Sequence, residues 1–275
     1  MRRPDRGQGK PELTEALHYV DLPSLRYLTH GLTFDASRCA KVLDSTLVDL
    51  NRINGFPDQM SAWIRAGGLA AGPGPYEGGK RFVIEVHETQ DLQGQRMQMA
   101  VAKSIDEPQR APVVFLEMHS QTLDIPMRVE IPLRVLMKGG PPLERTYTVY
   151  VHALLTDEGQ AWVYYGITRR GWSIRFHEHT RAAVATRSQR LLAKTLDALI
   201  DARAAQLSGA ADGRPALAGI VTSICSVGLS QKAALESEEY LVDKYSLAGM
   251  HPFGLNMIPG GQAGLAHTQR FRRRS

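Results

Sequence analysis

Two stretches in the second half of the chain, YTVYVHALL and AWVYYGIT, carry tyrosines where a strand would present them to a bound substrate. Side chains alternate across a strand, so Tyr150 and His152 face away from the neighbouring apolar residues, as do Tyr164 and Gly166. The polar stretch TDEGQ between the runs predicts a hairpin, which brings Tyr150 and Tyr164 onto one side. We predict that Tyr165 packs in the core on the opposite side, and that Gly166 leaves room for close approach.

The stretch SQKAALESEEYLVDKYS predicts a helix with a carboxylate on its buried face. At about 100° per residue, Glu238 lies at the centre of an apolar stripe that comprises Ala234, Leu235, Leu241, Val242 and Tyr245. Carboxylates are rarely placed on a buried face without a partner. One interpretation is a structural pair with an internal arginine. The other, which we favour, is a carboxylate kept for metal binding or acid–base chemistry.

The stretch GWSIRFHEHTRAAV predicts another helix with a histidine in its apolar stripe. Trp172, Phe176, His179 and Ala183 share this stripe, and Arg175 lies four residues before His179 on an adjacent face. A lone histidine in such a stripe is more often a hydrogen-bonded core residue than a catalyst. The two histidines of HEH point about 200° apart on a helix, and no cysteine lies nearby, so the sequence argues against a zinc site.

Together these segments resemble the GIY-YIG nuclease superfamily over roughly residues 146–262. TVY is similar to the first signature of that family and YYG to the second, while RFHEH resembles its helical arginine with a histidine four residues on. ESEEYLVDKY resembles the helix with the metal-binding glutamate, and GLNMIPGG the closing asparagine and glycines. The resemblance implies catalytic roles for Tyr150, Tyr164, Arg175, His179 and Glu238, and substrate-binding roles for Gly166, Arg169, Arg170 and Asn256.

The activity implied by the resemblance is that of a DNA endonuclease that leaves 5′-phosphate and 3′-hydroxyl ends. Glu238 would hold a single divalent cation, usually Mg²⁺ with Mn²⁺ as a substitute, because Mg²⁺ prefers carboxylate oxygens and water. Tyr150 would be the general base, and cationic neighbours must then lower its pKa from the usual value of about 10. Arg175 would clamp the scissile phosphate. Tyr164 and His179 would position the water or donate to the phosphate, and Asn256 is a structural support rather than a direct participant.

Two features depart from the pattern of the family. Thr148 stands where the family has glycine, which favours the alternative of a non-catalytic nucleic-acid-binding protein built on a degenerate nuclease domain. Residues 184–216 form an enlarged helical segment, either an extra DNA-contacting helix or a packing insertion. A third alternative, a scaffolding protein, leaves the positions of Glu238 and His179 unexplained.

The helical and strand-like patterns along the chain predict an α+β protein. Residues 35–67 are helical in pattern, and the strand-like runs RFVIEVHE, RMQMAVAK, PVVFLEMH and MRVEIPLRVLM follow. Several of them alternate as in an antiparallel sheet with one face covered. The second half reads strand, strand, helix, helix, strand, helix, which predicts a small antiparallel sheet flanked by helices.

A Gly/Pro-rich stretch, KGGPPLERT, predicts a boundary between two domains. We expect a disordered segment at 1–12, an α+β domain of unrecognised fold at 13–140, a nuclease-like domain at 146–266 and a basic tail at 267–275. The tail either stays solvated or contacts phosphates, and the sequence does not separate these two options.

Composition and charge indicate the cellular compartment and the class of binding partner. The 275 residues are 43% hydrophobic and 22% charged, with neither a membrane-length apolar run nor a secretory signal, so we expect a cytoplasmic protein. Cys39 and Cys225 are expected to be buried thiols. Residues 1–147 hold 18 Lys/Arg and 18 Asp/Glu, whereas residues 148–275 hold 15 and 10.

The basic second half indicates a polyanionic partner, here DNA. Because the nuclease core offers little surface for sequence reading, the first domain is expected to select the target, recruit a partner or form a homodimer. The sequence does not distinguish duplex, branched and single-stranded substrates, and it does not identify the recognition sequence or the biological pathway.

Overall fold

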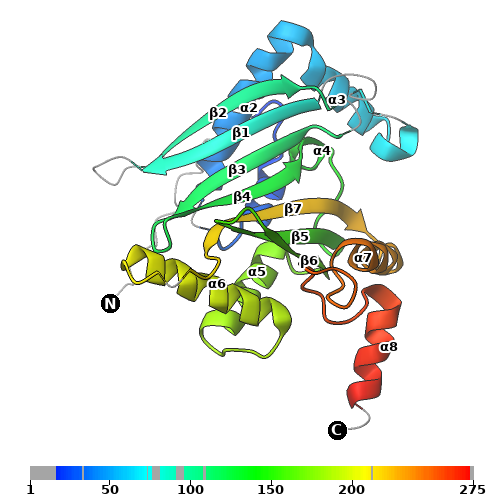
Figure 1. Ribbon diagram of the computed structural model, residues 1–275. Coiled ribbons are helices and arrows are strands. Elements are labelled where there is room, and N and C mark those ends of the chain that lie inside the picture. The colour runs from blue at the N-terminus through cyan, green and yellow to red at the C-terminus, as the bar shows by residue number, and fades with distance from the viewer. Residues whose placement is uncertain are drawn as a thin grey trace, which may run out of the picture.

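A computed structural model of the chain describes residues 17–32, 34–72, 74–75, 81–90, 96–107, 110–211 and 213–272. Within these residues the strands form one seven-stranded mixed sheet in the order β2-β1-β3-β4-β7-β5-β6, with helices packed on it (Figure 1). The predicted α+β class is confirmed at this level. The segment 1–12, for which the sequence predicts disorder, lies outside the described residues.

The elements of the first half build the upper part of the molecule in Figure 1. In chain order they are α1 (Leu22–Leu28), α2 (Ala36–Asn54), α3 (Phe56–Arg65), the 3₁₀ turn η1 (Gly68–Ala71), β1 (Arg81–Gln90), β2 (Arg96–Ile105), β3 (Val113–Ser120), β4 (Ile125–Pro132) and α4 (Leu133–Leu136). The Asp35 carboxylate caps α2 by accepting the Arg38 N–H at 3.0 Å, which is the capping chemistry that starts helices. Buried Leu43 and Leu47 then face the sheet.

The elements of the second half follow the predicted order. They are β5 (Tyr147–Thr156), β6 (Ala161–Thr168), α5 (Trp172–Val184), α6 (Leu191–Leu207), β7 (Leu217–Leu229), α7 (Gln231–Tyr245) and α8 (Gly261–Arg272). The sheet formed by β7, β5 and β6 is antiparallel, as expected for this half.

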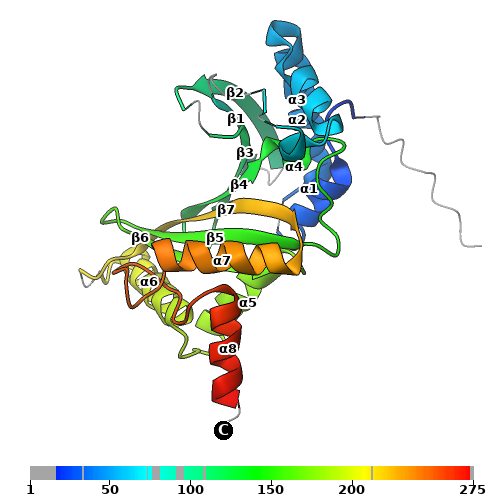
Figure 2. The same cartoon turned by 90° about the vertical axis from the view of Figure 1, so that its right-hand side faces the viewer.

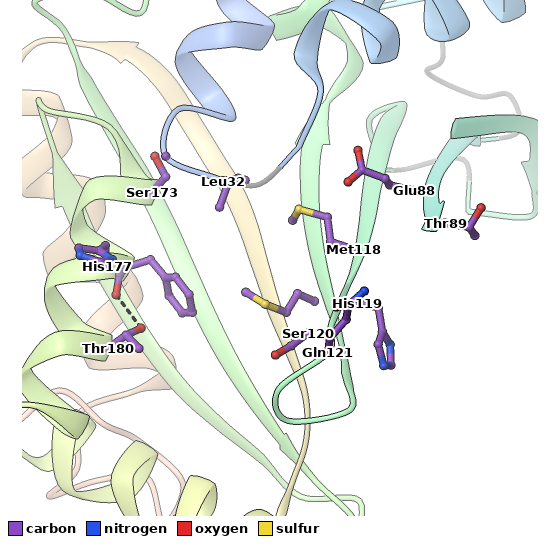
Figure 3. Close-up of a pocket in the computed structure, with 13 residues that line it drawn as sticks. Leu32, Glu88, Thr89, Met118, His119, Ser120, Gln121, Ser173, His177 and Thr180 are labelled. Atoms are coloured by element: carbon purple, nitrogen blue, oxygen red, sulfur yellow. Dashed lines mark hydrogen bonds between the residues drawn. The ribbon is translucent and has the colours of Figure 1, made fainter. Parts of the chain in front are cut away.

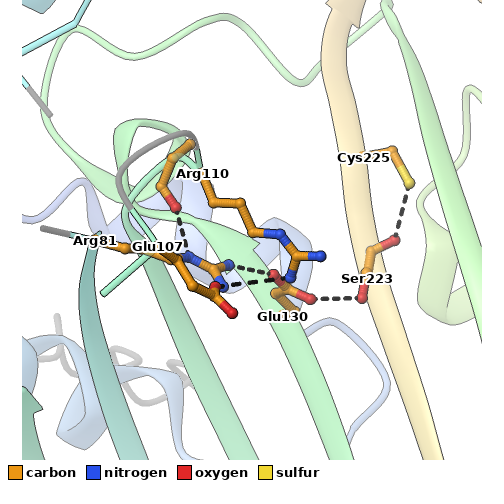
Figure 4. Close-up of polar contacts among 7 residues, drawn as sticks. Arg81, Glu107, Arg110, Glu130, Ser223 and Cys225 are labelled. Carbon is orange, nitrogen blue, oxygen red and sulfur yellow. Dashed lines mark hydrogen bonds and ion pairs between the residues drawn. The ribbon is translucent and has the colours of Figure 1, made fainter. Parts of the chain in front are cut away.

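The two halves share one sheet, so the picture of a separate small sheet is wrong. β7 pairs with β5 on one side and in parallel with β4 on the other, where Met127 lies opposite Ile220. Arg81 of β1 forms an ion pair of 2.8 Å with Glu130 of β4, and Glu130 accepts a hydrogen bond of 2.8 Å from Ser223 of β7 (Figure 4). The stretch 138–146 is a loop as predicted, but strand pairing continues across the junction. The division into two domains there stays a prediction.

Helices cover the two faces of the sheet unequally. One face holds α1, α2 and α3 over its first half and α5 and α6 over its second, with buried Tyr150, Trp172 and Ile224 in the same apolar cluster as the N-terminal helices. α7 lies on the opposite face of β5 and β6 (Figure 2), where the Tyr165 and Tyr245 rings are 6.0 Å apart. Tyr165 therefore packs beneath a helix, as predicted.

Several local expectations from the sequence are wrong. The run MRVEIPLRVLM is a strand only to Pro132 and then becomes α4, and β1 pairs in parallel with β3 rather than antiparallel. Cys39 is buried, but Cys225 is exposed beside Ser223 on the face of β7 that carries the polar network of Figure 4.

The start of the predicted basic tail is helical. α8 continues to Arg272, and residues 273–275 lie outside the described part of the chain. The Gly/Pro-rich stretch before it suggested turns only, but the N–H of Gly261 and the N–H of Gln262 are bound by side chains of α7. Capping of these amides lets a helix begin there. Across the described residues, no helix has the length and apolar character needed to cross a membrane.

Candidate active site

Tyr150 and Gly166 lie directly opposite each other in the β5–β6 ladder. A Cβ atom on Gly166 would lie 2.7 Å from the Tyr150 hydroxyl oxygen and 2.9 Å from the ring carbon that bears it. Both distances are shorter than a Cβ atom makes to a non-bonded atom in proteins. Glycine is therefore needed because the Tyr150 ring crosses over it. The sequence predicts close approach at Gly166, and the approaching group is this tyrosine of the same sheet.

The Tyr150 side chain is fully buried, with 0% of its surface exposed. Burial raises its pKa well above the usual range, and neighbouring Tyr164 raises it further, whereas the positive charge of Arg175 lowers it. Burial also raises the pKa of Tyr164, again opposed by Arg175. Among the described residues, no hydrogen-bond partner of good geometry meets the Tyr150 hydroxyl. Arg175 thus favours the phenolate at both tyrosines, and Arg190 adds to this effect at Tyr164.

α5 brings Arg175 and His179 to the same face of the sheet as Tyr150 and Tyr164. The indole N–H of Trp172, in its first turn, donates to the Leu28 carbonyl at 2.8 Å and so ties α5 to the N-terminal half. The Tyr164 and His179 rings are 5.0 Å apart. Desolvation lowers the pKa of His179 to about 4, and the Arg175 charge acts in the same direction. His179 is therefore a neutral imidazole at pH 7, and its pKa is too low for an efficient general base at that pH. It can still donate or accept a hydrogen bond.

His152 belongs to this cluster although the sequence assigned it no role. Its ring is 4.7 Å from the Tyr150 ring and 6.0 Å from the His179 ring. The Nδ1 atom lies 2.9 Å from the Thr222 hydroxyl oxygen, and burial holds the pKa of the imidazole well below its usual value. Strand alternation already placed His152 beside Tyr150, and this was the signal for its position.

Arg175 combines partial burial with a fixed partner. Its side chain is 28% exposed, and its guanidinium forms an ion pair with Glu178 one turn on. Glu178 in turn binds Arg170 at 2.8 Å. Arg169 and Arg170 are both exposed, and Arg190 at the start of α6 lies near enough to lower the pKa of both Tyr164 and His179. Arg170 and Arg190 therefore lie near Arg175 and His179, and no pattern in the sequence predicted this position of Arg190.

Glu238 lies on α7, across the sheet from α5, and its charge is near enough to act on the pKa of Tyr150 and of Tyr164. Its Oε2 atom accepts the Gly261 N–H at 3.1 Å, and the Ile167 N–H is directed at the same carboxylate. Desolvation raises its pKa, while these amides and Arg175 lower it. The structural partner is thus backbone at the start of α8 and in β6, not the single internal arginine that the sequence suggested as the alternative. Gly261 has a φ of 59°, and a Cβ there would lie 2.4 Å from the Leu235 carbonyl oxygen, so only glycine lets α8 start this close to α7.

The Glu238 carboxylate could serve as a ligand of a Mg²⁺ ion. The Glu238 carboxylate keeps lone pairs beyond those used by the two amides, and its desolvation is the cost that a bound cation would offset. Within the described residues there is no group of three or more His, Cys, Asp or Glu side chains able to hold a metal. A Mg²⁺ ion that keeps most of its waters needs no such group.

Asn256 supports the edge strand of the sheet. Its amide oxygen accepts the Tyr165 N–H at 3.1 Å and the Ser246 hydroxyl at 2.7 Å, and its amide nitrogen donates to the Tyr165 carbonyl at 2.9 Å. The side chain is buried at 8% exposure. These contacts agree with the structural support that the sequence favoured over direct participation.

The enlarged segment 184–216 contains α6. Its residues Leu192, Leu196 and Leu199 are buried against Leu154 and Ile220 of the sheet. These contacts fit the packing insertion, the second of the two roles that the sequence left open. Arg187 and Arg190, at the loop before α6, remain exposed.

A cavity lies beside α5 and is lined by residues of this helix and of the strands β1, β3 and β4 (Figure 3). It has a volume of about 830 Å³ and opens between α5 and the strands β3 and β4, with Ser173, Phe176, Met118 and Met127 among its lining residues. None of the five residues predicted to be catalytic lines it.

Family models, curated proteins and solved structures were compared with the chain, and none of them matches it. The resemblance to the GIY-YIG superfamily therefore stays a prediction from short motifs.

Proposed function

We propose that the protein is a divalent-metal-dependent DNA endonuclease that leaves 5′-phosphate and 3′-hydroxyl ends. One observation supports the proposal: Tyr150, Tyr164, Arg175 and His179 lie on one face of the sheet, and the charge of Glu238 on α7 shifts the pKa of Tyr150 and of Tyr164. The arrangement combines proton-transfer groups, a permanent positive charge and a carboxylate, which are the parts that phosphodiester hydrolysis requires.

In this proposal the attacking water loses a proton to the Tyr150 phenolate as its oxygen bonds to phosphorus. The bond from phosphorus to the 3′ oxygen breaks, this oxygen takes a proton from solvent water to become the 3′-hydroxyl, and Tyr150 then releases its proton to solvent. Arg175 stabilises both the phenolate and the negative charge that builds on the phosphate. Neutral His179 and Tyr164 donate or accept hydrogen bonds that orient the water. Exposed Arg169, Arg170 and Arg190 hold the flanking phosphates of the DNA.

Glu238 is the residue that would hold Mg²⁺, or Mn²⁺ in its place. A bound cation supplies charge stabilisation for the leaving 3′ oxygen. The chain contributes a carboxylate whose position is fixed by two backbone amides. Its negative charge interacts with the charge of Arg175 and raises the pKa of both tyrosines.

A second candidate is a nucleic-acid-binding protein without activity. The raised pKa of Tyr150 favours it, because a phenol that stays protonated cannot take a proton from water. The hydrogen bond from the Gly261 N–H to Glu238 also favours it, because it gives Glu238 a structural role at the start of α8. The buried Thr148, which replaces the glycine of the family, is a further point in its favour.

The test is incubation of the wild-type protein with labelled duplex, flap, junction and single-stranded DNA, in Mg²⁺ and in EDTA. The nuclease proposal expects Mg²⁺-dependent cuts that carry 5′-phosphates. Binding of DNA in EDTA without any cut in Mg²⁺ or Mn²⁺ would instead establish the second candidate.

Two substitutions at Glu238 separate its chemical and structural roles. Glu238→Gln keeps an oxygen that accepts the Gly261 N–H but loses the charge, so we expect DNA binding and a protected α8 with cleavage reduced by at least about 100-fold. Glu238→Ala should lose cleavage and also expose the α8 amides to hydrogen exchange. Cleavage by Glu238→Gln at the wild-type rate would remove Glu238 from the metal site.

A further inference from the structure

The two edges of the sheet are treated differently by the chain. At β6 the edge is covered: the Val163 N–H donates to the Phe253 carbonyl and the Val163 carbonyl accepts the Leu255 N–H, both at 2.9 Å, and Asn256 binds both backbone groups of Tyr165. At the other edge β2 pairs with β1 alone. Among the described residues, no backbone group other than those of β1 pairs with β2, so the outer row of N–H and C=O groups has no partner in this part of the chain.

β2 also lacks the features that usually protect an edge strand from pairing. It is ten residues long and contains no proline, whereas exposed edges are commonly short or interrupted. Three side chains in alternation, Met97, Met99 and Val101, point to the face without a helix and are 58%, 61% and 44% exposed. Lys103 continues this row, but its charge is engaged by Glu85 at 2.7 Å.

We propose that β2 is the interface of a homodimer, in which the β2 strands of two copies pair antiparallel and join the two sheets into one. The inference is independent of the proposed nuclease activity. It concerns the part of the chain that the active-site cluster does not use.

A second copy fits this edge better than a different partner for reasons of symmetry and charge. Two antiparallel copies of one strand are related by a two-fold axis, so each backbone hydrogen bond is made twice. An axis normal to the sheet pairs odd-numbered with odd-numbered residues, which sets Met97, Met99 and Val101 of the two copies side by side. Residues 1–147 carry equal numbers of basic and acidic residues, so net charge does not oppose the contact. An apolar row in a neutral half is a poor site for DNA.

The dimer is expected to be reversible. One strand edge with three apolar side chains buries less surface than a stable interface of standard size, so dissociation constants of roughly micromolar order are expected. Sedimentation equilibrium of the full chain across this range should show an average mass that rises from 30.4 kDa toward twice that value.

Two variants and one hydrogen-exchange measurement on the wild type test the interface. Val101→Lys adds a charge to the row of Met97, Met99 and Val101 and should keep the chain monomeric at every concentration. Met250→Lys is the matched control, because Met250 is 66% exposed but lies far from β2 in the loop after α7, and it should dimerise as wild type does. Hydrogen exchange in the 96–105 segment of the wild type should slow as concentration rises, because alternate β2 amides become bonded.

A wild-type chain that stays monomeric at high concentration would overturn the proposal, as would a dimer that Val101→Lys leaves intact. Protection of the 96–105 amides that is independent of concentration would also overturn it. That result would mean that another segment of the same chain covers the edge.

Discussion

The two ends of the sheet differ in how far helices and loops of the same chain cover them. Around β5 and β6, helices cover both faces and a loop seals the edge, so that Tyr150 is fully buried and five polar residues are held by packing. Around β2, one face and one edge stay open, and apolar side chains project to the surface. One sheet thus holds a packed polar cluster at one end and a row of exposed apolar side chains at the other, and close packing restricts side-chain motion only at the first.

The largest effect is expected at the enclosed end, from loss of the charge that faces both tyrosines. Arg175→Ala should lower the rate of DNA cleavage by about 10³-fold, because one preformed donor to the transition state is worth about that much. Arg181→Ala is the matched control on the same helix, since Arg181 is exposed. Single-turnover cleavage with saturating DNA measures the effect. Equal losses in the two variants would show that α5 acts through general charge rather than through the cluster.

A methyl group at Gly166 should disturb the enclosed end through packing alone. Gly166→Ala brings a Cβ to 2.7 Å from the Tyr150 hydroxyl, so we expect a loss of about 1–3 kcal/mol in the free energy of unfolding. Gly249→Ala serves as control because no atom lies within 4 Å of its added Cβ. Urea unfolding compares the two. Adding Tyr150→Phe removes the closest atom and should recover part of the loss, and no recovery at all would place the strain elsewhere.

The hairpin, the helical phases of Glu238 and His179 and the support role of Asn256 could be predicted because each depends on local periodicity. Alternation in YTVYVH and VYYGIT fixes the side-chain directions of their strands, and a helical stripe fixes which residue faces inward. The sequence could not show that β7 pairs with β4, because strand pairing between distant segments is set by packing rather than by local pattern. It also missed Arg190 and the capping of α8 by Glu238, which depend on how loops bring distant residues together.

Buried histidines should make the enclosed end sensitive to acid. His152 and His179 have pKa values below the unfolded value, so between about pH 6.5 and pH 4 the unfolded chain binds protons that the native chain does not. Stability is therefore present above pH 6.5 and falls as the pH is lowered, by about 1.4 kcal/mol per pH unit for each histidine. His152→Gln should reduce this slope in urea titrations at several pH values, whereas substitution of the exposed His30 serves as control. An unchanged slope in His152→Gln would assign the acid sensitivity to other groups.

The smallest effect is expected at the open end, and it sharpens the comparison. Met99→Gln exchanges one exposed side chain for another of similar length, so the free energy of unfolding should change by less than about 0.5 kcal/mol. The measurement uses protein concentrations at which the chain sediments as a monomer, because association would add to apparent stability. Leu116→Ala in neighbouring β3, where the side chain is 0% exposed, should cost about 2–5 kcal/mol and calibrates the same sheet. A loss in Met99→Gln close to that of Leu116→Ala would mean that this row is already packed within the monomer. The open end would then be as enclosed as the end that carries the candidate site.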